Sequence, residues 1–218
     1  LAALSAAGRF LENRFSRPDE LAMEAGLAML PVGGLWLAAS RWGAAPMGFE
    51  EPTVLLTAVH FHFAGLAACV SVGCACRWAR RWRLKSRPLI LALSAGVVAG
   101  VPLLAAGIAS RSMFEVVAAM ILAFSLGGFC LVSLFVIVPR LPGAAARVLL
   151  AIALGSAVVS MHYAGHYAAS VARKVASENY SIPRMATVHG LLNALGFSLC
   201  GLLAWVAAER AGRAKTAA

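Results

Sequence analysis

Long apolar runs constrain this chain more than any other feature of its sequence. A helix that crosses the hydrocarbon core of a bilayer needs about 20 mostly apolar residues, and six runs meet that length. They cover residues 21–39, 54–76, 88–109, 113–138, 146–171 and 183–208. The chain is 61% hydrophobic and 13% charged, which is far from the composition of a soluble domain. We therefore expect an all-α fold, a polytopic bundle of six transmembrane helices.

The rest of the sequence lies in short segments at the ends of these runs. We expect residues 1–20 to form a cytoplasmic or juxtamembrane segment, residues 21–208 the transmembrane domain, and residues 209–218 a cytoplasmic basic tail. The opening letters LAALSAAGRFLENRF are typical of the end of a helix, so a seventh, upstream span is an open alternative.

Basic residues are distributed unevenly between the two sides of the expected bundle. If the N-terminus is cytoplasmic, 14 lysines and arginines lie inside and 5 outside. The positive-inside rule then predicts that both termini are cytoplasmic, and the six spans predict that the protein crosses the inner (cytoplasmic) membrane several times. The net charge of +10 is explained by these loops. We expect the lipid bilayer and no nucleic acid as a partner, because no polar element carries a stripe of basic and aromatic residues. The oligomeric state is left open.

All five histidines of the chain fall inside expected spans. They are His60 and His62 in the second span, His162 and His166 in the fifth, and His189 in the sixth. A helical rise of 1.5 Å per residue places all of them roughly 8–14 Å from the outer ends of their spans. Ionisable side chains within a membrane are costly and mark functional sites by default. The sequence thus predicts a layer of histidines near the outer face.

Helical angles divide these histidines into those that can and cannot share a centre. His162 and His166 are four residues apart, so they share a helix face and can supply two ligands to one metal ion. His60 and His62 are two residues apart and point in nearly opposite directions. We expect His60 to face inwards, because its face of the helix is small and polar, and His62 to be a supporting or alternate ligand.

Other polar side chains are expected near this layer. Glu115 begins the fourth span at its outer end, and Tyr163 is adjacent to His162; both are candidate catalytic groups for proton transfer. Tyr167 is adjacent to His166 and is a further candidate. Asn193 lies one turn after His189, and Thr57 lies one turn before His60, so we expect these two to support the histidines.

These residues support more than one function. The first is a metal-dependent enzyme, in which the five histidines hold zinc or iron and a metal-activated water attacks a lipid-like small molecule. A proton-coupled carrier is the alternative, since histidine clusters suit proton relays. A haem protein with two axial histidines is less favoured, and a purely structural network of polar contacts between helices is the fourth possibility.

Two blocks of sequence carry a family resemblance. LLTAVHFHFAGL at residues 55–66 and PRMATVHGLLNALGF at residues 183–197 resemble the YndJ family of bacterial integral membrane proteins. The resemblance implies a polytopic membrane fold, and it implies that His60, His62, His189 and Asn193 are family-type positions. It leaves open whether the carrier alternative is a YndJ-type transporter, and it implies no particular reaction.

Overall fold

A computed structural model of the chain describes residues 17–110, 112–173 and 181–217. Every regular element in this part of the chain is helical. Within the same residues, six helical stretches are long and apolar enough to cross a membrane. The predicted all-α, six-span fold is confirmed. The possible upstream helix and most of the expected N-terminal segment lie outside the described residues.

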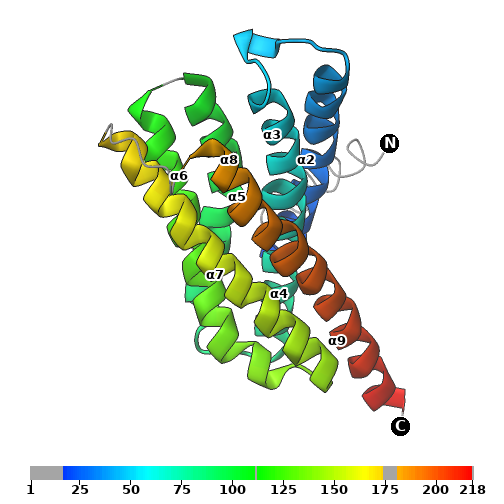
Figure 1. Ribbon diagram of the computed structural model, residues 1–218. Helices are drawn as coiled ribbons and strands as arrows, with labels where there is room; N and C mark the ends of the chain where they lie inside the picture. Colours follow the sequence, from blue (N-terminus) through cyan, green and yellow to red (C-terminus); the bar gives the residue numbers. More distant parts are fainter. Residues whose placement is uncertain (1–16, 111, 174–180, 218) are drawn as a thin grey trace.

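The spans follow one another in antiparallel order and are joined by short connections (Figure 1). The second and sixth spans each combine several helical segments, whereas the other four are single α-helices. The spans are α2 (Pro18–Arg41), α3–η2–α4 (Thr53–His60, Phe61–Ala68, Cys69–Arg81), α5 (Arg87–Ser110), α6 (Met113–Val136), α7 (Ala144–Ala172) and α8–η5–η6–α9 (Ile182–Arg184, Met185–His189, Leu192–Leu199, Cys200–Ala217). Two short 3-10 turns, η1 (Pro46–Gly48) and η3 (Val138–Arg140), lie in the connections.

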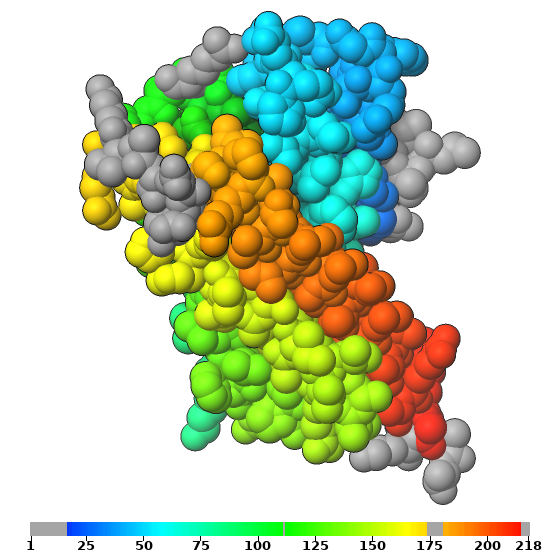
Figure 2. Space-filling view, in the orientation of Figure 1, coloured from blue at the N-terminus to red at the C-terminus, as the bar shows by residue number. Residues whose placement is uncertain are grey.

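Five spans surround a common interior, and α2 packs outside them against the second span. Helices that follow each other along the chain pack in pairs, from α4 on α5 to α6 on α7, and the sixth span packs on α7. The sixth span also contacts the second through η2 with η6 and α4 with α9, which closes the ring. Figure 2 shows the sixth span lying diagonally between α7 and the second span.

Large apolar side chains cover the outside of the ring. Phe124 and Phe135 on α6 are 75% and 71% exposed, and Leu35 on α2 is 73% exposed. In water such surfaces are rare on a monomeric protein. In a bilayer these side chains contact the apolar lipid tails, which agrees with the spans expected from the sequence.

One end of the bundle, which we call the basic end, carries the α4–α5 connection, η3 and the last turns of α9 (Figure 1). The buried carboxylate of Asp19 accepts a hydrogen bond of 2.8 Å from Arg80 and lies 3.6 Å from the guanidinium of Arg77. Arg81 pairs with Glu209 of α9 at 3.2 Å. The sequence predicted that the second span ends at residue 76. The structure extends the helix through residues 77–81, because acidic partners on α2 and α9 hold the arginines of this segment against the bundle.

The same end contains most of the tightly packed interior. Ile90, Ile137, Leu141 and Leu150 are at most 1% exposed, and they come from α5, the α6–α7 connection and α7. Such close packing contributes dispersion energy that lipid tails cannot supply as well. The opposite end, called the cavity end below, is packed differently.

A candidate ligand-binding cavity

A cavity of about 1060 Å³ lies at the cavity end of the bundle. Its walls come from all six spans, and most of its lining side chains are apolar, from Trp36 and Phe49 at one side to Leu122 and Phe197 at the other. Pockets for small molecules usually have volumes of roughly 300–1000 Å³ and combine apolar walls with a few polar groups. The cavity is large enough for a ligand with a substantial apolar part.

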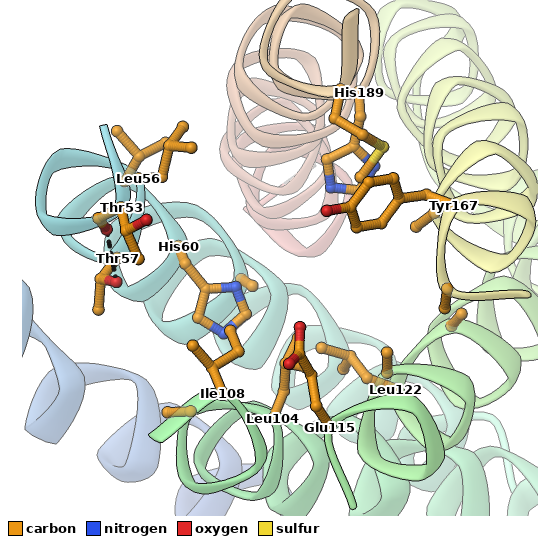
Figure 3. A pocket seen from close by; sticks show the side chains of 18 of the residues that line it. Thr53, Leu56, Thr57, His60, Leu104, Ile108, Glu115, Leu122, Tyr167 and His189 are labelled. Carbon is orange, nitrogen blue, oxygen red and sulfur yellow. Dashed lines mark hydrogen bonds between the residues drawn. The ribbon is translucent and has the colours of Figure 1, made fainter. Parts of the chain in front are cut away.

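Among the described residues, four ionisable side chains line this apolar space, and each comes from a different span. They are His60 of the second span, Glu115 of α6, Tyr167 of α7 and His189 of the sixth span. Figure 3 shows all four directed into the cavity, with His60 and His189 on different walls and the Glu115 carboxylate between the helices. Of the two histidines in the second span, His60 lines the cavity and His62 is not among its lining residues.

His60 lines the cavity, and one of its ring nitrogens is buried against the surrounding helices. Its Nε2 atom is buried and has no hydrogen-bond partner among the residues that the structure describes. A buried polar atom without a partner costs free energy, and a ligand that pairs with it recovers that free energy. Thr57, one turn before, donates its hydroxyl to the Thr53 carbonyl at 2.8 Å, so its bonding capacity is partly satisfied within its own helix (Figure 3).

His189 is held in place by a polar network between α7 and the sixth span. Its Nδ1 lies 3.1 Å from the carbonyl oxygen of Ser160 and 2.8 Å from the Ser160 hydroxyl. The Asn193 amide donates to the His189 carbonyl at 2.9 Å and also to the Ser160 hydroxyl. A carbonyl oxygen can only accept, so the network favours a proton on Nδ1 and leaves the lone pair of Nε2 for a ligand. Asn193 thus supports His189, as its spacing predicted.

Glu115 reaches the cavity because α5 and α6 approach each other closely. The α6 helix begins at Met113 after Ser112, whose hydroxyl accepts a hydrogen bond of 3.3 Å from the Phe114 amide. A Cβ atom added to Gly107 of α5 would lie 2.7 Å from the Glu115 Cα. Only glycine at position 107 allows this approach. Glu115 lies in the first turn of α6, where the helix dipole favours negative charge.

The two spans that carry the cavity histidines depart from regular α-helix beside them. His60 is the last residue of α3, and the next eight residues form the π-helical segment η2. His189 is the last residue of the π-helical segment η5, and Asn193 lies in a second π-helical segment, η6. The sequence predicted uninterrupted α-helices here. Turns with i→i+5 hydrogen bonds are rare and are found disproportionately at functional sites.

The other predicted site residues lie elsewhere. His62 packs against α2, where a Cβ on Gly33 would lie 2.7 Å from its ring, and its Nδ1 lies 2.8 Å from the Ala58 carbonyl. His162 and His166 do share a face of α7, with ring centroids 4.4 Å apart, but both are exposed on the outside of the bundle.

Tyr163, which the sequence suggested as a catalytic group, is likewise not among the residues that line the cavity. Tyr167, one turn later on α7, lines it instead.

The five histidines are therefore not brought together in one centre. Among the residues that the structure describes, no three His, Cys, Asp or Glu side chains lie close enough to hold one metal ion. The histidines have similar depths in the membrane, but they point in different directions around their helix axes, so their side chains do not converge. Zinc, iron or haem binding stays a prediction.

Comparison with known proteins places this fold in a family. A family model described as YndJ-like protein matches residues 1–197. The chain belongs to this YndJ-like family. The match includes every residue that lines the cavity and ends at Phe197, one of those lining residues.

A curated relative from Bacillus subtilis (strain 168), described as uncharacterized membrane protein YndJ, is 26% identical over 203 residues. The aligned region covers 93% of this chain and 36% of that relative, so the chain spans about a third of the relative's length. No solved structure matches this chain significantly.

Ser160 and Tyr167 are the cavity-end residues that sequence reasoning missed or set aside. They are seven residues apart, so they share one face of α7, and Ala164 and Ala168 between and beside them also line the cavity. The sequence could have indicated this face through its stripe of small and hydroxyl-bearing residues, which lies on the side of α7 opposite His162.

Proposed function

We propose that this protein binds an amphipathic, lipid-like small molecule in the cavity and exchanges protons with its polar group. One observation carries the proposal: a large apolar cavity inside a membrane bundle receives His60, Glu115, Tyr167 and His189 from four separate spans. The apolar walls suit the acyl or prenyl part of a ligand, and the four polar side chains suit its head group.

The chemistry of these side chains supports proton transfer. A carboxylate and two imidazoles that line one water-poor space include both proton acceptors and potential donors. His189 is oriented by Ser160 and Asn193 in the way that catalytic histidines are oriented by a third group. An enzyme that acts on a lipid head group and a proton-coupled carrier of such a molecule both need this arrangement.

The membrane and orientation follow from the same proposal. The family relative is a bacterial membrane protein, and the excess of basic residues lies at the end of the bundle opposite the cavity. The positive-inside rule then puts the protein in the bacterial cytoplasmic membrane with the cavity towards the outer leaflet. Labelling of single cysteines introduced at Met47 and Gly212 by a membrane-impermeant reagent in intact cells tests this, because only the first should react.

A metal-dependent variant of the proposal rests on fewer donors than the sequence suggested. His60, Glu115 and His189 supply nitrogen and oxygen atoms around one cavity, but metal coordination by all three needs movement from the described geometry. Metal analysis of the purified protein checks for zinc or iron. An absorption spectrum checks for haem, whose Soret band would support His60 and His189 as axial ligands.

Photolabelling tests the central proposal. Purified protein in nanodiscs is irradiated with phosphatidylglycerol that carries a diazirine on its acyl chain, and the labelled peptides are identified by mass spectrometry. We expect labels on cavity-lining peptides of α5 and α6. His60→Ala, His189→Ala and Glu115→Gln should each lower labelling there about fivefold or more, because each removes a hydrogen bond to the head group.

His162→Ala is the matched control. It removes the same imidazole from an exposed position on α7 and should leave cavity labelling unchanged. Equal labelling of the cavity in wild type and in all three cavity variants, with each protein folded by circular dichroism, would refute a role for these side chains in binding. Loss of labelling in the His162→Ala control instead would favour the exposed face of α7 as the binding site.

A further inference from the structure

Between the cavity and the basic end, the interface of the second and sixth spans contains buried polar atoms with no bonding partner. The hydroxyls of Ser71 and Ser198 belong to residues that are 2% and 4% exposed. Neither hydroxyl has a hydrogen-bond partner among the residues that the structure describes. Inside an apolar bundle an unsatisfied hydroxyl costs free energy, so such atoms usually contact ordered water or take part in function.

Ser71 lies at this interface, and Ser198 lies on the side of the sixth span that is turned away from α7. A Cβ on Gly201 would lie 3.7 Å from the Ser71 hydroxyl, so Ser71 touches the sixth span one turn beyond Ser198. A Cβ on Gly196 would collide with Ser156 of α7. Ser198 is two residues further, on roughly the opposite side of the helix from α7, which is the side that packs on the second span.

This pair begins where the cavity ends. Ala68 and Phe197 line the cavity, and Ser71 and Ser198 come one turn and one residue later along their spans. Neither serine lines the cavity itself. The two hydroxyls therefore lie directly below its apolar floor, on the side towards the basic end.

Further polar groups continue the same line to the basic end. Trp205, 4% exposed and one turn after Gly201, has an indole N–H without a partner in the described part of the chain. Glu209 follows one turn later and pairs with Arg81 of the second span at 3.2 Å. Residues 198, 201, 205 and 209 form one stripe at helical spacing, and residues 71 and 81 belong to the span that faces it.

We infer that protons pass between the cavity and the basic end along this interface, through Ser71, Ser198 and water held by them and by Trp205. A hydroxyl accepts a proton through its lone pair and releases its own proton to the next acceptor, so the charge moves while the serine is unchanged. Such a route needs water between the hydroxyls, because neither serine hydroxyl is hydrogen-bonded to the other or to any other described residue. The inference rests on the proposed function, since it supplies the route for the protons that the cavity side chains exchange.

Proton flux into vesicles tests the route. Protein is reconstituted into phosphatidylethanolamine–phosphatidylglycerol vesicles that contain a pH-sensitive dye, and a potassium gradient with valinomycin drives protons inwards. We expect faster acidification than in protein-free vesicles, and a rate about tenfold lower for Ser71→Ala/Ser198→Ala, which removes both relay hydroxyls. Equal rates in wild-type and protein-free vesicles, or in wild type and the double variant, would overturn the inference.

Ser133→Ala is the matched control for this experiment. Ser133 of α6 is also fully buried, and its hydroxyl has no partner among the described residues, but α6 does not form the interface of the second and sixth spans. Its variant should conduct protons like wild type, and a tenfold loss there would also overturn the route.

Photolabelling of the cavity separates the two proposals. Ser71→Ala/Ser198→Ala should retain wild-type labelling, because both serines lie outside the lining, and this result also shows that the variant is folded. If proton flux depends on the serines but cavity labelling does not depend on His60, Glu115 or His189, then the proposed function fails and the proton route stands. If cavity labelling depends on His60, Glu115 or His189 but proton flux does not depend on the serines, then the route is overturned and the proposed function stands.

Discussion

Asp19 and Glu209 pair with arginines at the basic end, whereas His60 and Glu115 at the cavity end line an apolar space. Asp19 binds two arginines and Glu209 binds a third. Glu115 and His60 instead line the cavity, and His60 keeps a buried nitrogen without a partner in the described structure. The helices differ in the same way, since the basic half of the second span is regular α-helix and its cavity half is partly π-helical.

On the proposed function, this difference separates the part of the bundle that contributes most to stability from the part that binds the ligand. Tight packing and satisfied charges contribute most of the folding free energy where they occur, and local stability is uneven within a protein. Groups that must bind a ligand cannot be fully satisfied by the protein, so a binding end is less stable than the rest. Three experiments test whether the two ends differ in this way.

The largest expected effect is on stability at the basic end. Ile137→Ala removes a fully buried side chain and should lower the free energy of unfolding by about 3 kcal/mol, because the cavity it leaves cannot collapse. Leu104→Ala, in the lining of the existing cavity, should lower it by only about 1 kcal/mol. Reversible unfolding in mixed micelles with increasing sodium dodecyl sulfate measures both. Similar losses at the two positions would contradict the separation.

A smaller effect is expected where the cavity end is closely packed. Gly107→Ala places a methyl group 2.7 Å from the Glu115 Cα, so α5 and α6 must move apart at a cost of about 2 kcal/mol. Cavity labelling by the photoreactive lipid should fall as well, because Glu115 moves. Gly155→Ala is the control: no atom lies within 4 Å of the added Cβ, and the change should be neutral or stabilising by up to about 1 kcal/mol. Unchanged labelling in Gly107→Ala would show that the position of Glu115 does not matter for binding.

The smallest effect is expected for the ion pairs of the basic end. Asp19→Asn keeps the size of the buried side chain but removes its charge, and it should destabilise the protein by about 1 kcal/mol, since Arg77 and Arg80 are partly exposed to solvent. The loss should shrink in high salt, which screens the wild-type pairs. Cavity labelling should be the same as in wild type, and a decrease would show that the two ends are coupled.

The spans, and part of the site, were predictable from the sequence. Apolar length locates a transmembrane helix because lipid excludes backbone polar groups, and all six expected spans appear. The second and sixth helices continue to Arg81 and Ala217, beyond their expected ends at residues 76 and 208, so the expected tail at 209–218 is largely helical. The expectation that His60 rather than His62 faces inwards came from the small and polar residues on the His60 face of the helix. Glu115 was located because a short connection fixes where the fourth span begins.

The expected five-histidine centre failed for a physical reason. Depth follows from the rise along a helix, but rotation about the helix axis depends on which face packs against the neighbours. On α7 the small face that includes Ser160 and Ala164 packs inwards, so His162 and His166 turn outwards. The π-helical segments were also unpredictable, because composition and spacing there are those of an ordinary apolar helix.

The π-helical segments also affect how the protein can change in length. An i→i+5 turn contains one residue more than an α-turn, so it can absorb a single-residue insertion or deletion without changing the phase of the helix beyond it. In the second and sixth spans, η2 and η6 separate the histidines from α4 and α9. Homologues can therefore vary in length at these two places and turn new side chains into the cavity, while the helices of the basic end keep their contacts.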